Sequence, residues 1–361
     1  MAAPYDLTSA AGLRSYLQDH GGLADNEITI LSGGTANYVY RVVDSNGISK
    51  IYKHAAPYSH SNKDFTLDVR RMDYEARILE LQSATSQQAP NSAVHAVHLI
   101  SYDREQKLLC LEEGGSRNLK AAYGDVELNI CKIGADLAQW LASLHRTSRA
   151  ISLALSTQNS TTDNSHHHNN NNPVAIPLYR HAYTNLHLAL SEFGHDKQLG
   201  ARINDKYGAL LASDDECICH GDFWPGNILV QGAKAQLTVV DWELVRRGTS
   251  ATDVGQFAAE AFLLDRFKGE RGLLAAFLGS YAKARGGGVD SVWVRRMVVH
   301  CAVHIAYWPT RVAWTDREGT QELVDMGVGV MEAALADDWE NILGSRLLLG
   351  VRETCKGMLG M

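Results

Sequence analysis

The sequence has few cysteines, no excess of basic residues and no long hydrophobic run. Its six cysteines are spread irregularly over 361 residues, unlike the disulfide framework of a secreted domain, so we expect a reducing compartment. The 34 basic and 41 acidic residues give a formal net charge of -7 at pH 7. This balance excludes a global positive field that would attract nucleic acid or an acidic membrane surface, and it suits a small or cationic substrate.

No segment has the pattern of a secretory signal or of a membrane span. Residues Met1 to Gln18 lack the apolar core that a signal peptide requires. The most apolar stretch, Met297 to Trp308, is too short to cross a bilayer and contains His300 and His304, so it predicts a buried helix. We therefore expect a cytoplasmic protein with neither nucleic-acid nor membrane partners, and the sequence leaves the oligomeric state open.

The sequence does contain ample apolar material, 45% of its residues, and its length suggests two lobes. Helical spacing occurs over 8–20 and 65–81, and β-rich runs are found at 27–31, 37–44, 48–54, 94–102 and 107–111. Beyond Gly114 the pattern becomes mainly helical, starting with an apolar stripe from Ile130 to Leu144. We predict an α+β fold with a five-stranded antiparallel N-lobe over 1–113 and a mainly helical C-lobe over 114–361.

A low-complexity segment interrupts the second lobe at residues 156–172. It contains three consecutive histidines, His166 to His168, followed by four asparagines. Such a composition buries too little apolar surface to order itself, so we predict an exposed loop insertion. Metal binding by the three histidines is the alternative, but a loose run has no second shell of residues to orient the rings.

A polar loop between two apolar runs carries the strongest chemical signal. It reads His220-Gly221-Asp222-Phe223-Trp224-Pro225-Gly226-Asn227. An Asp followed five residues later by an Asn is the spacing of a kinase catalytic loop, in which the Asp accepts the substrate proton and the Asn binds magnesium. Cys217 and Cys219 precede the loop, and without a second chelating pair they predict buried strand cysteines rather than a zinc site.

A second acidic motif, Asp241-Trp242-Glu243, follows the loop at the end of an apolar strand. Kinases keep their second metal-binding Asp at this point. Asn227, Asp241 and, as a weaker candidate, Glu243 would supply the oxygen ligands that magnesium prefers. The alternative is that Asp241 only ends a strand in a turn.

The first lobe contains residues in the order expected of a nucleotide site. Lys53 lies on the third predicted strand, and Glu75 lies on the apolar face of the following helix, where a carboxylate needs a cationic partner. A glycine-containing turn between the first two strands could bind phosphates through its backbone N–H groups, with Gly33, Gly34, Thr35 and Asn37 as candidates. The last strand leads into the second lobe, where a kinase hinge would contact adenine, through Leu111, Glu112 and Glu113.

Taken together, these motifs resemble the aminoglycoside phosphotransferase and choline kinase superfamily over nearly the whole chain. Two branches are most similar, the methylthioribose kinases and the fungal 4-hydroxytryptamine kinases. The second resembles the chain more closely, through Leu31-Ser32-Gly33-Gly34, Lys53-His54-Ala55, Gly226-Asn227 and Asp241-Trp242-Glu243-Leu244. The resemblance implies a protein-kinase-like fold that binds ATP and two Mg²⁺ ions between its lobes.

The resemblance also implies a role for each matching residue. Lys53 would contact the α- and β-phosphates, Glu75 would hold Lys53, and Asp222 would act on the acceptor hydroxyl. Asn227 and Asp241 would bind Mg²⁺. A regulatory, pseudokinase-like ATP-binding protein is the alternative of another class, although such proteins usually lack at least one of these residues.

The expected acceptor is a small hydroxylated metabolite, such as a hydroxylated arylamine like 4-hydroxytryptamine. A sugar such as methylthioribose, or an aminoglycoside, is the alternative. The candidate acceptor residues beside Asp222 are Trp224, Trp308, Arg311 and Trp314. Tryptophan faces attract ammonium groups, whereas Arg311 would repel them. The alternative is that the aromatic residues only pack in the core.

Overall fold

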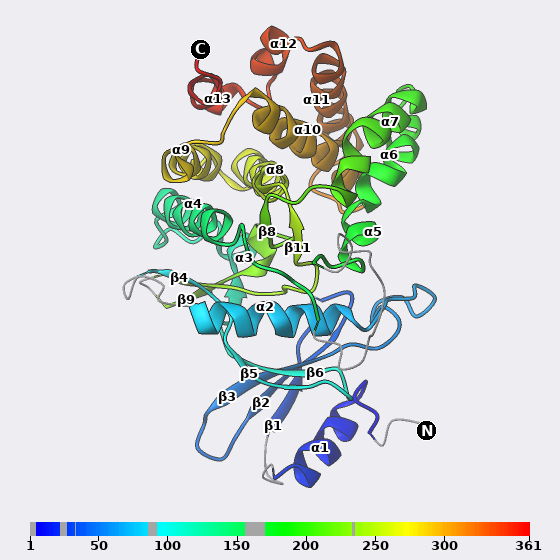
Figure 1. The fold of residues 1–361 in the computed structure, drawn as a ribbon, viewed down its shortest axis with the longest axis vertical. Coiled ribbons are helices and arrows are strands. Elements are labelled where there is room, and N and C mark those ends of the chain that lie inside the picture. The colour runs from blue at the N-terminus through cyan, green and yellow to red at the C-terminus, as the bar shows by residue number, and fades with distance from the viewer. Residues whose placement is uncertain (1–4, 22–26, 33, 86–91, 156–169, 233–234) are drawn as a thin grey trace.

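The structure is a computed structural model, and it describes residues 5–21, 27–32, 34–85, 92–155, 170–232 and 235–361. It confirms the predicted fold class, because a five-stranded antiparallel sheet is followed by a mainly helical remainder (Figure 1). Helix α1 (Ala10–Asp19) and helix α13 (Arg352–Leu359) lie at opposite ends of the molecule (Figure 1). None of the helices formed by the described residues combines the length and hydrophobicity needed to cross a membrane.

The five-stranded sheet has the order β1-β2-β3-β6-β5. Its strands are β1 (Glu27–Ile30), β2 (Tyr38–Val43), β3 (Ser49–His54), β5 (Leu99–Asp103) and β6 (Leu108–Glu112). Side chains alternate between its two faces, so that Tyr38, Tyr40 and Val42 pack under α1 (Ala10–Asp19) while Val39 and Lys53 face the cleft. Helix α2 (Arg71–Thr85) lies between this sheet and the helical remainder (Figure 1).

A second sheet joins the two parts of the chain. It has the order β4-β10-β9-β7, with β4 (Val94–Ala96), β7 (Arg117–Asn118), β9 (Ile228–Gln231) and β10 (Gln236–Val239). The predicted single strand over 94–102 is therefore wrong: β4 pairs in parallel with β10, and only β5 joins the first sheet. The chain changes sheets at Val97, whose N–H donates to the Val239 carbonyl.

The helical remainder surrounds a third, two-stranded sheet of β8 (Cys217–Cys219) and β11 (Arg246–Gly248). Its helices are α3 (Leu119–Ala122), α4 (Ile130–Thr147), α5 (Ala175–Tyr179), α6 (His181–Glu192), α7 (Lys197–Ile203), α8 (Ser250–Lys268), α9 (Leu273–Arg285), α10 (Ser291–Tyr307), α11 (Arg317–Ala336), α12 (Trp339–Gly344) and α13 (Arg352–Leu359). Tighter or wider helical turns occur at Asn204–Gly208, Ala209–Ala212, Pro225–Asn227, Trp308–Thr310 and Leu349–Val351. The predicted buried helix over 297–308 forms the second half of α10, and Pro309 ends it as expected.

Helix α2 begins six residues later than the pattern over 65–81 predicts. Thr66 pairs with Tyr58 in an isolated β-bridge, and the Leu67 N–H donates to the Pro57 carbonyl. These bonds keep the chain extended before Arg71, because a backbone N–H used across a hairpin is not free to continue a helix. Leu67 therefore fits the helical spacing because its side chain is buried, although its backbone is not helical.

The prediction of an exposed insertion over 156–172 is wrong for its last two residues. Residues 156–169, including the three histidines, lie outside the described residues, and Asn170 is exposed, but Asn171 is partly buried. The Asn172 side chain is fully buried. It donates to the Val245 carbonyl at 2.9 Å and accepts from the N–H groups of Val174 and Ala175 at 3.0 and 3.2 Å. Asn172 therefore fixes the segment that follows the Asp241 motif to the start of α5.

Replacing Asn172 with alanine should lower the free energy of unfolding by about 2–3 kcal/mol, because one buried carbonyl and two N–H groups lose their partner. Urea denaturation followed by circular dichroism measures this loss. Asn170→Ala is the matched control, since Asn170 is exposed and its side chain accepts one hydrogen bond, from Ser152 at 2.8 Å, among the described residues. If the Asn172 variant and the control had the same free energy of unfolding, the buried hydrogen bonds of Asn172 would not stabilise the fold.

Candidate active site

A cleft of about 940 Å³ lies between the five-stranded sheet and the helical remainder. Most of the residues predicted from the sequence line it. They are Gly34, Thr35, Asn37, Lys53, Glu75, Leu111, Glu112, Glu113, Asp222, Asn227, Asp241, Glu243 and Trp308. Gly33 lies outside the described residues. The long-range pairing of the sheets thus brings together motifs that are far apart in the sequence.

Lys53 forms the centre of a buried charge cluster. Its ammonium donates to Glu75 Oε2 at 2.7 Å and to Asp241 Oδ1. Burial raises the pKa of Glu75 to about 7, although the Lys53 charge opposes the rise. Burial works against a charged lysine, but the charges of Asp241 and Glu75 outweigh it and raise the pKa of Lys53. The predicted pairing of Lys53 with Glu75 is thus present, and Asp241 joins it from the other lobe.

Asp222 and Asn227 lie side by side in the loop that the sequence singled out. Asn227 Nδ2 donates to Asp222 Oδ2 at 2.9 Å, and Gln256 Nε2 on α8 donates to Asp222 Oδ1 at 2.7 Å. Burial, and then the nearby Asp241 charge, raise the pKa of Asp222 to about 7. A carboxylate with this pKa can take up or release a proton near neutral pH, which a general base requires.

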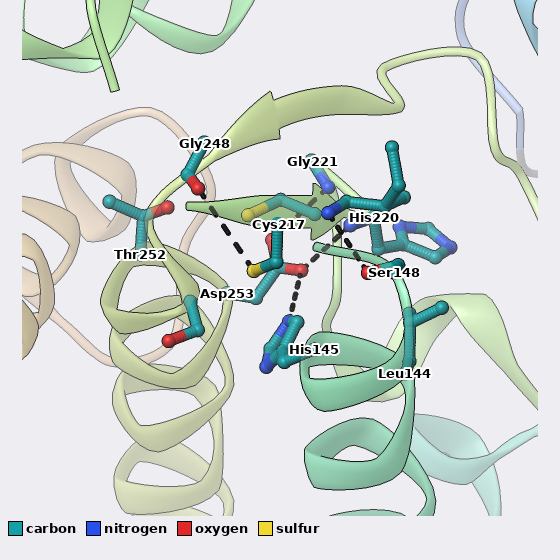
Figure 2. Close-up of polar contacts among 12 residues, drawn as sticks. Leu144, His145, Ser148, Cys217, His220, Gly221, Gly248, Thr252 and Asp253 are labelled. Carbon is teal, nitrogen blue, oxygen red and sulfur yellow. Dashed lines mark hydrogen bonds and ion pairs between the residues drawn. The ribbon is translucent and has the colours of Figure 1, made fainter. Parts of the chain in front are cut away.

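The backbone of this loop is fixed from below by Asp253 on α8 (Figure 2). Its carboxylate accepts from the N–H groups of His220 at 2.7 Å and Gly221 at 3.1 Å, and it also contacts His145 Nε2 at 3.3 Å. Burial alone would raise the pKa of Asp253, but the hydrogen bond with His145 contributes to lowering it to about 2. The ionised carboxylate therefore holds two consecutive loop N–H groups in place.

Gly221 allows the loop to turn at this point. Its φ is +86°, and a Cβ there would lie 1.9 Å from the Leu244 carbonyl oxygen. His220 fills the space beneath, with Nδ1 accepting from the Asp222 N–H and Nε2 facing the Val240 carbonyl at 3.0 Å. Burial lowers the pKa of His220 to about 4, so this ring is neutral and acts as a spacer within the loop.

The Asp241 motif turns sharply into the cleft. Asp241 has a φ of +66°, an unusual value for a residue with a Cβ. The following Trp242 is completely buried, and its ring packs against His220 at a centroid distance of 4.4 Å. The backbone N–H of Trp242 donates to Glu75 Oε1 at 3.3 Å. These contacts hold Asp241 in its left-handed conformation and direct its carboxylate toward Lys53.

Glu243 connects the two lobes. Its Oε2 accepts from Arg71 Nε on α2 at 3.0 Å and from Asn37 Nδ2 at 2.7 Å. Arg71 in turn donates to Asn37 Oδ1 at 2.9 Å. The Asn37 side chain, predicted to be near phosphates, is thus used in a contact between lobes, and one oxygen of Glu243 is engaged there as well.

The oxygen atoms that remain in the cleft fit a magnesium ion. Within the described part of the chain, Asn227 Oδ1 and Asp241 Oδ2 take part in no hydrogen bond, although the other atoms of both side chains do. Ligand atoms of Glu75, Asp241 and Glu243 also lie within 4.8 Å of one another. Carboxylate and amide oxygens are hard ligands, which magnesium prefers.

The glycine-containing turn and the hinge border the opposite side of the cleft. The Thr35 carbonyl accepts from Ser59 Oγ at 2.6 Å and from the Ser61 N–H at 3.0 Å, which ties the turn to the segment before α2. At the hinge, Gly114 approaches β10 so closely that a Cβ would lie 2.7 Å from the Thr238 side chain. A glycine is therefore needed where the chain passes from one lobe to the other.

The predicted acceptor residues lie in three different places. Trp308 lines the cleft together with His181 and Asp222. By contrast, Trp224 and Trp314 lie on either side of the Lys120 ammonium, with ring centroids 5.1 and 4.0 Å away. The remaining candidate, Arg311, pairs with Glu192 at 3.2 Å on the exposed surface and is not among the cleft-lining residues.

Sequence reasoning missed several residues that the structure brings to the site. They are Arg71, His181, Asp253 and Gln256. A signal was present for two of them, because Asp253 and Gln256 are polar residues three positions apart on a helix that is mostly apolar. A polar stripe on an otherwise buried helix indicates partners elsewhere in the fold. Arg71 and His181 gave no such signal.

Comparisons with known proteins identify the family. The model of the phosphotransferase enzyme family matches residues 27–295, and the chain belongs to this family. It is 26% identical over 355 residues to the 4-hydroxytryptamine kinase of Psilocybe cyanescens, covering 92% of this chain and 95% of that one. The 4-hydroxytryptamine kinase of Psilocybe cubensis is 24% identical over 366 residues, which cover 95% of this chain and 98% of that enzyme. The protein is thus a small-molecule kinase that phosphorylates a hydroxyl group.

Solved structures with a similar fold were also found. One is an ethanolamine kinase of Plasmodium vivax, with 13% identity, 95% of this chain and 85% of that chain covered, and a TM-score of 0.48. Another is a type VIII aminoglycoside 3'-phosphotransferase, with 19% identity and a TM-score of 0.47. The match covers 79% of this chain and 95% of that chain.

Proposed function

We propose that this kinase transfers the γ-phosphoryl group of ATP, with Mg²⁺, to the hydroxyl of a hydroxylated arylamine such as 4-hydroxytryptamine. The observation that carries the proposal is the cleft itself, in which an aromatic wall of Trp308 and His181 borders the same space as Asp222. Residues 1–113 would form the nucleotide-binding lobe, and residues 114–361 would contribute the catalytic loop and the acceptor site.

The charge cluster suits the nucleotide end of the cleft. Lys53 would contact the phosphates while Glu75 holds its ammonium in position, since their separation is already 2.7 Å. Mg²⁺ bound through Asn227 and Asp241 would neutralise charge on the phosphate oxygens. Most of the rate enhancement in such a site comes from positioning and charge stabilisation.

Asp222 suits the acceptor end. Its carboxylate is held by Asn227 and Gln256 on two sides, so its orientation is fixed before the acceptor binds. In our proposal it orients the acceptor hydroxyl and accepts its proton as the oxygen attacks phosphorus. The pKa of about 7 allows Asp222 to act as a base at neutral pH.

The aromatic wall suits an arylamine. Trp308 is 36% exposed, and its ring lies 6.3 Å from that of His181, whose Nε2 contacts the Tyr307 hydroxyl at 3.0 Å. Burial, and then the Arg311 charge, lower the pKa of His181, so this ring is neutral at physiological pH and does not repel an ammonium group. Arg311 itself is paired with Glu192 and is not among the residues that line the cleft. An aryl ring would therefore stack on this wall without meeting a free cation from these residues.

The test is a comparison of kcat/KM for 4-hydroxytryptamine, 4-hydroxyindole, methylthioribose, choline and an aminoglycoside. We expect 4-hydroxytryptamine to be the best acceptor and 4-hydroxyindole, which has the ring but not the amine, to be weaker. Trp308→Ala should raise KM for 4-hydroxytryptamine about tenfold, the scale of a lost stacking and cation–π contact of about 1–1.5 kcal/mol.

Val312→Ala is the matched control, because Val312 lies in the same segment, is 53% exposed and does not line the cleft. A preference for an uncharged sugar, or an unchanged acceptor KM in the Trp308 variant, would show that the aromatic wall does not select the acceptor. In either case the assignment of the chain as a kinase would stand.

A further inference from the structure

We propose that His95, His98 and Glu112 form a binding site for a divalent transition metal ion of the zinc type behind the hinge. Ligand atoms of the three side chains lie within 4.8 Å of one another. The site differs from the proposed magnesium site in both residues and donor type. It does not depend on the identity of the acceptor.

The three residues come from the place where the chain passes between the two sheets. His95 lies on β4 opposite Thr238 of β10, and His98 lies in the short link between β4 and β5. Glu112 is the last residue of β6. The Glu112 N–H donates to the His98 carbonyl at 3.0 Å, and the His98 N–H donates to Glu112 Oε1 at 2.9 Å. Backbone bonds therefore fix the spacing of His98 and Glu112 without any metal.

The donor set is the one that zinc takes in proteins, two imidazoles and a carboxylate. His95 Nε2 lies 3.0 Å from Glu112 Oε1, close to the separation of two ligands that share a small ion at about 2.0–2.1 Å. Magnesium would favour oxygen ligands instead, so the two sites would select different ions.

His98 is the residue that a simple ion pair leaves unexplained. Its ring stacks near that of His95, with centroids 5.5 Å apart and an angle of 25° between the planes. Within the described part of the chain, no hydrogen bond or ion pair involves its ring nitrogens. A metal ion would give that ring a ligand role, and the partial exposure of all three residues leaves the ion a route of entry.

A second group of histidine and cysteine side chains lacks these properties. His145, Cys217 and Cys219 are all buried, and both ring nitrogens of His145 already have partners, Tyr281 and Asp253. This cluster is satisfied as it stands and supports the catalytic loop (Figure 2). The group behind the hinge retains both an unused ring and access.

A metal ion at this site would connect the two sheets across the hinge. One ligand belongs to β4 of the four-stranded sheet, and another ends a strand of the five-stranded sheet. Glu112 also lines the cleft. We therefore expect the bound ion to stiffen the hinge and to change the KM for the nucleotide more than kcat.

The experiment titrates the full-length protein, freed of metal by a chelator, with Co²⁺ in the presence of excess Mg²⁺. Visible absorption reports imidazole coordination, and competition with Zn²⁺ gives the zinc affinity. The excess Mg²⁺ occupies oxygen-rich sites such as the one around Asp241. We expect about one equivalent of Co²⁺ to bind, and Zn²⁺ to raise the melting temperature.

His95→Gln and His98→Gln should each weaken Co²⁺ binding by about 100-fold or more, since even the loss of a supporting residue costs 10- to 100-fold. Two controls should bind as the wild type does: His187→Gln, a helix-surface histidine, and a chain with His166, His167 and His168 all replaced by asparagine. Melting in EDTA checks that each variant folds. Unchanged Co²⁺ binding in the His98 variant, or loss of binding in the triple-asparagine chain, would overturn the proposal.

Discussion

Replacing Asp222 with asparagine is expected to lower turnover by about 100-fold or more, the scale of a lost general base. Asparagine has nearly the same shape but cannot accept the proton of the acceptor hydroxyl. Burial and the Asp241 charge raise the pKa of Asp222 to about 7, so the wild-type kcat/KM for the nucleotide should fall as the pH drops below about 7. The asparagine variant should lose this acidic limb. Steady-state kinetics from pH 5.5 to 9 measure both effects.

The melting temperature of the Asp222 variant shows whether its lost activity comes from the missing base or from a damaged fold. A carboxyl group with a raised folded-state pKa binds more protons when folded than when unfolded, so its contribution to stability falls as the pH rises from about 4 to about 7. Asparagine avoids this cost. At pH 8 we expect the Asp222 variant to melt at the same temperature as the wild type or higher. Near-normal turnover in a variant that melts in this way would remove Asp222 from the proposed mechanism.

Lys53→Met is expected to have the second large effect, on both turnover and stability. Methionine keeps the apolar stem but leaves the fully buried Glu75 without its cation, which costs about 3–5 kcal/mol of folding free energy. Turnover should fall by about 100- to 1,000-fold, as when a charge-stabilising donor is removed. Urea denaturation and steady-state kinetics measure the two losses. Because burial raises the pKa of Glu75 and the variant lacks the Lys53 charge that opposes this rise, the Glu75 carboxyl should take up a proton more readily, and part of the lost stability should return as the pH falls.

Combining Lys53→Met with Glu75→Gln distinguishes the two roles of the lysine. The second change removes one of the uncompensated charges, so the double variant should regain part of the stability that the single variant loses. Turnover should remain low, because nothing replaces the ammonium at the phosphates. Recovery of turnover together with stability would mean that Lys53 acts only in folding.

The elements set by local sequence were the ones that could be predicted. β2 and β3 follow from alternating residues around the Asn46-Gly47 turn, and the structure pairs Tyr38 with His54 and Val43 with Ser49 as this hairpin requires. The Asp222 loop was found because its spacing is local. Lys53 and Glu75 were predicted as a pair because a carboxylate on an apolar helix face needs a cation nearby.

The features that were missed depend on contacts between distant segments. Nothing in the pattern over 94–102 marks the change of sheet at Val97, because the partner strand β10 lies far along the chain. Composition placed Asn172 in an exposed loop, whereas its buried position depends on the carbonyl of Val245. The contact of Arg71 with Glu243 likewise joins two lobes that no local pattern connects.

The pairing of β4 with β10 has a consequence for the order in which the protein can fold during synthesis. β4 belongs to the first 113 residues, yet its hydrogen-bonding partners Leu237 to Val239 are made much later. Until then the buried side chains of Val94 and Val97 have no sheet to cover them, and a ribosome-bound fragment ending at the hinge would expose them to chaperones. The four-stranded sheet therefore takes β4 from the first lobe and its other three strands from the second, so dividing the chain at the hinge would remove one strand from that sheet while leaving the five-stranded sheet whole.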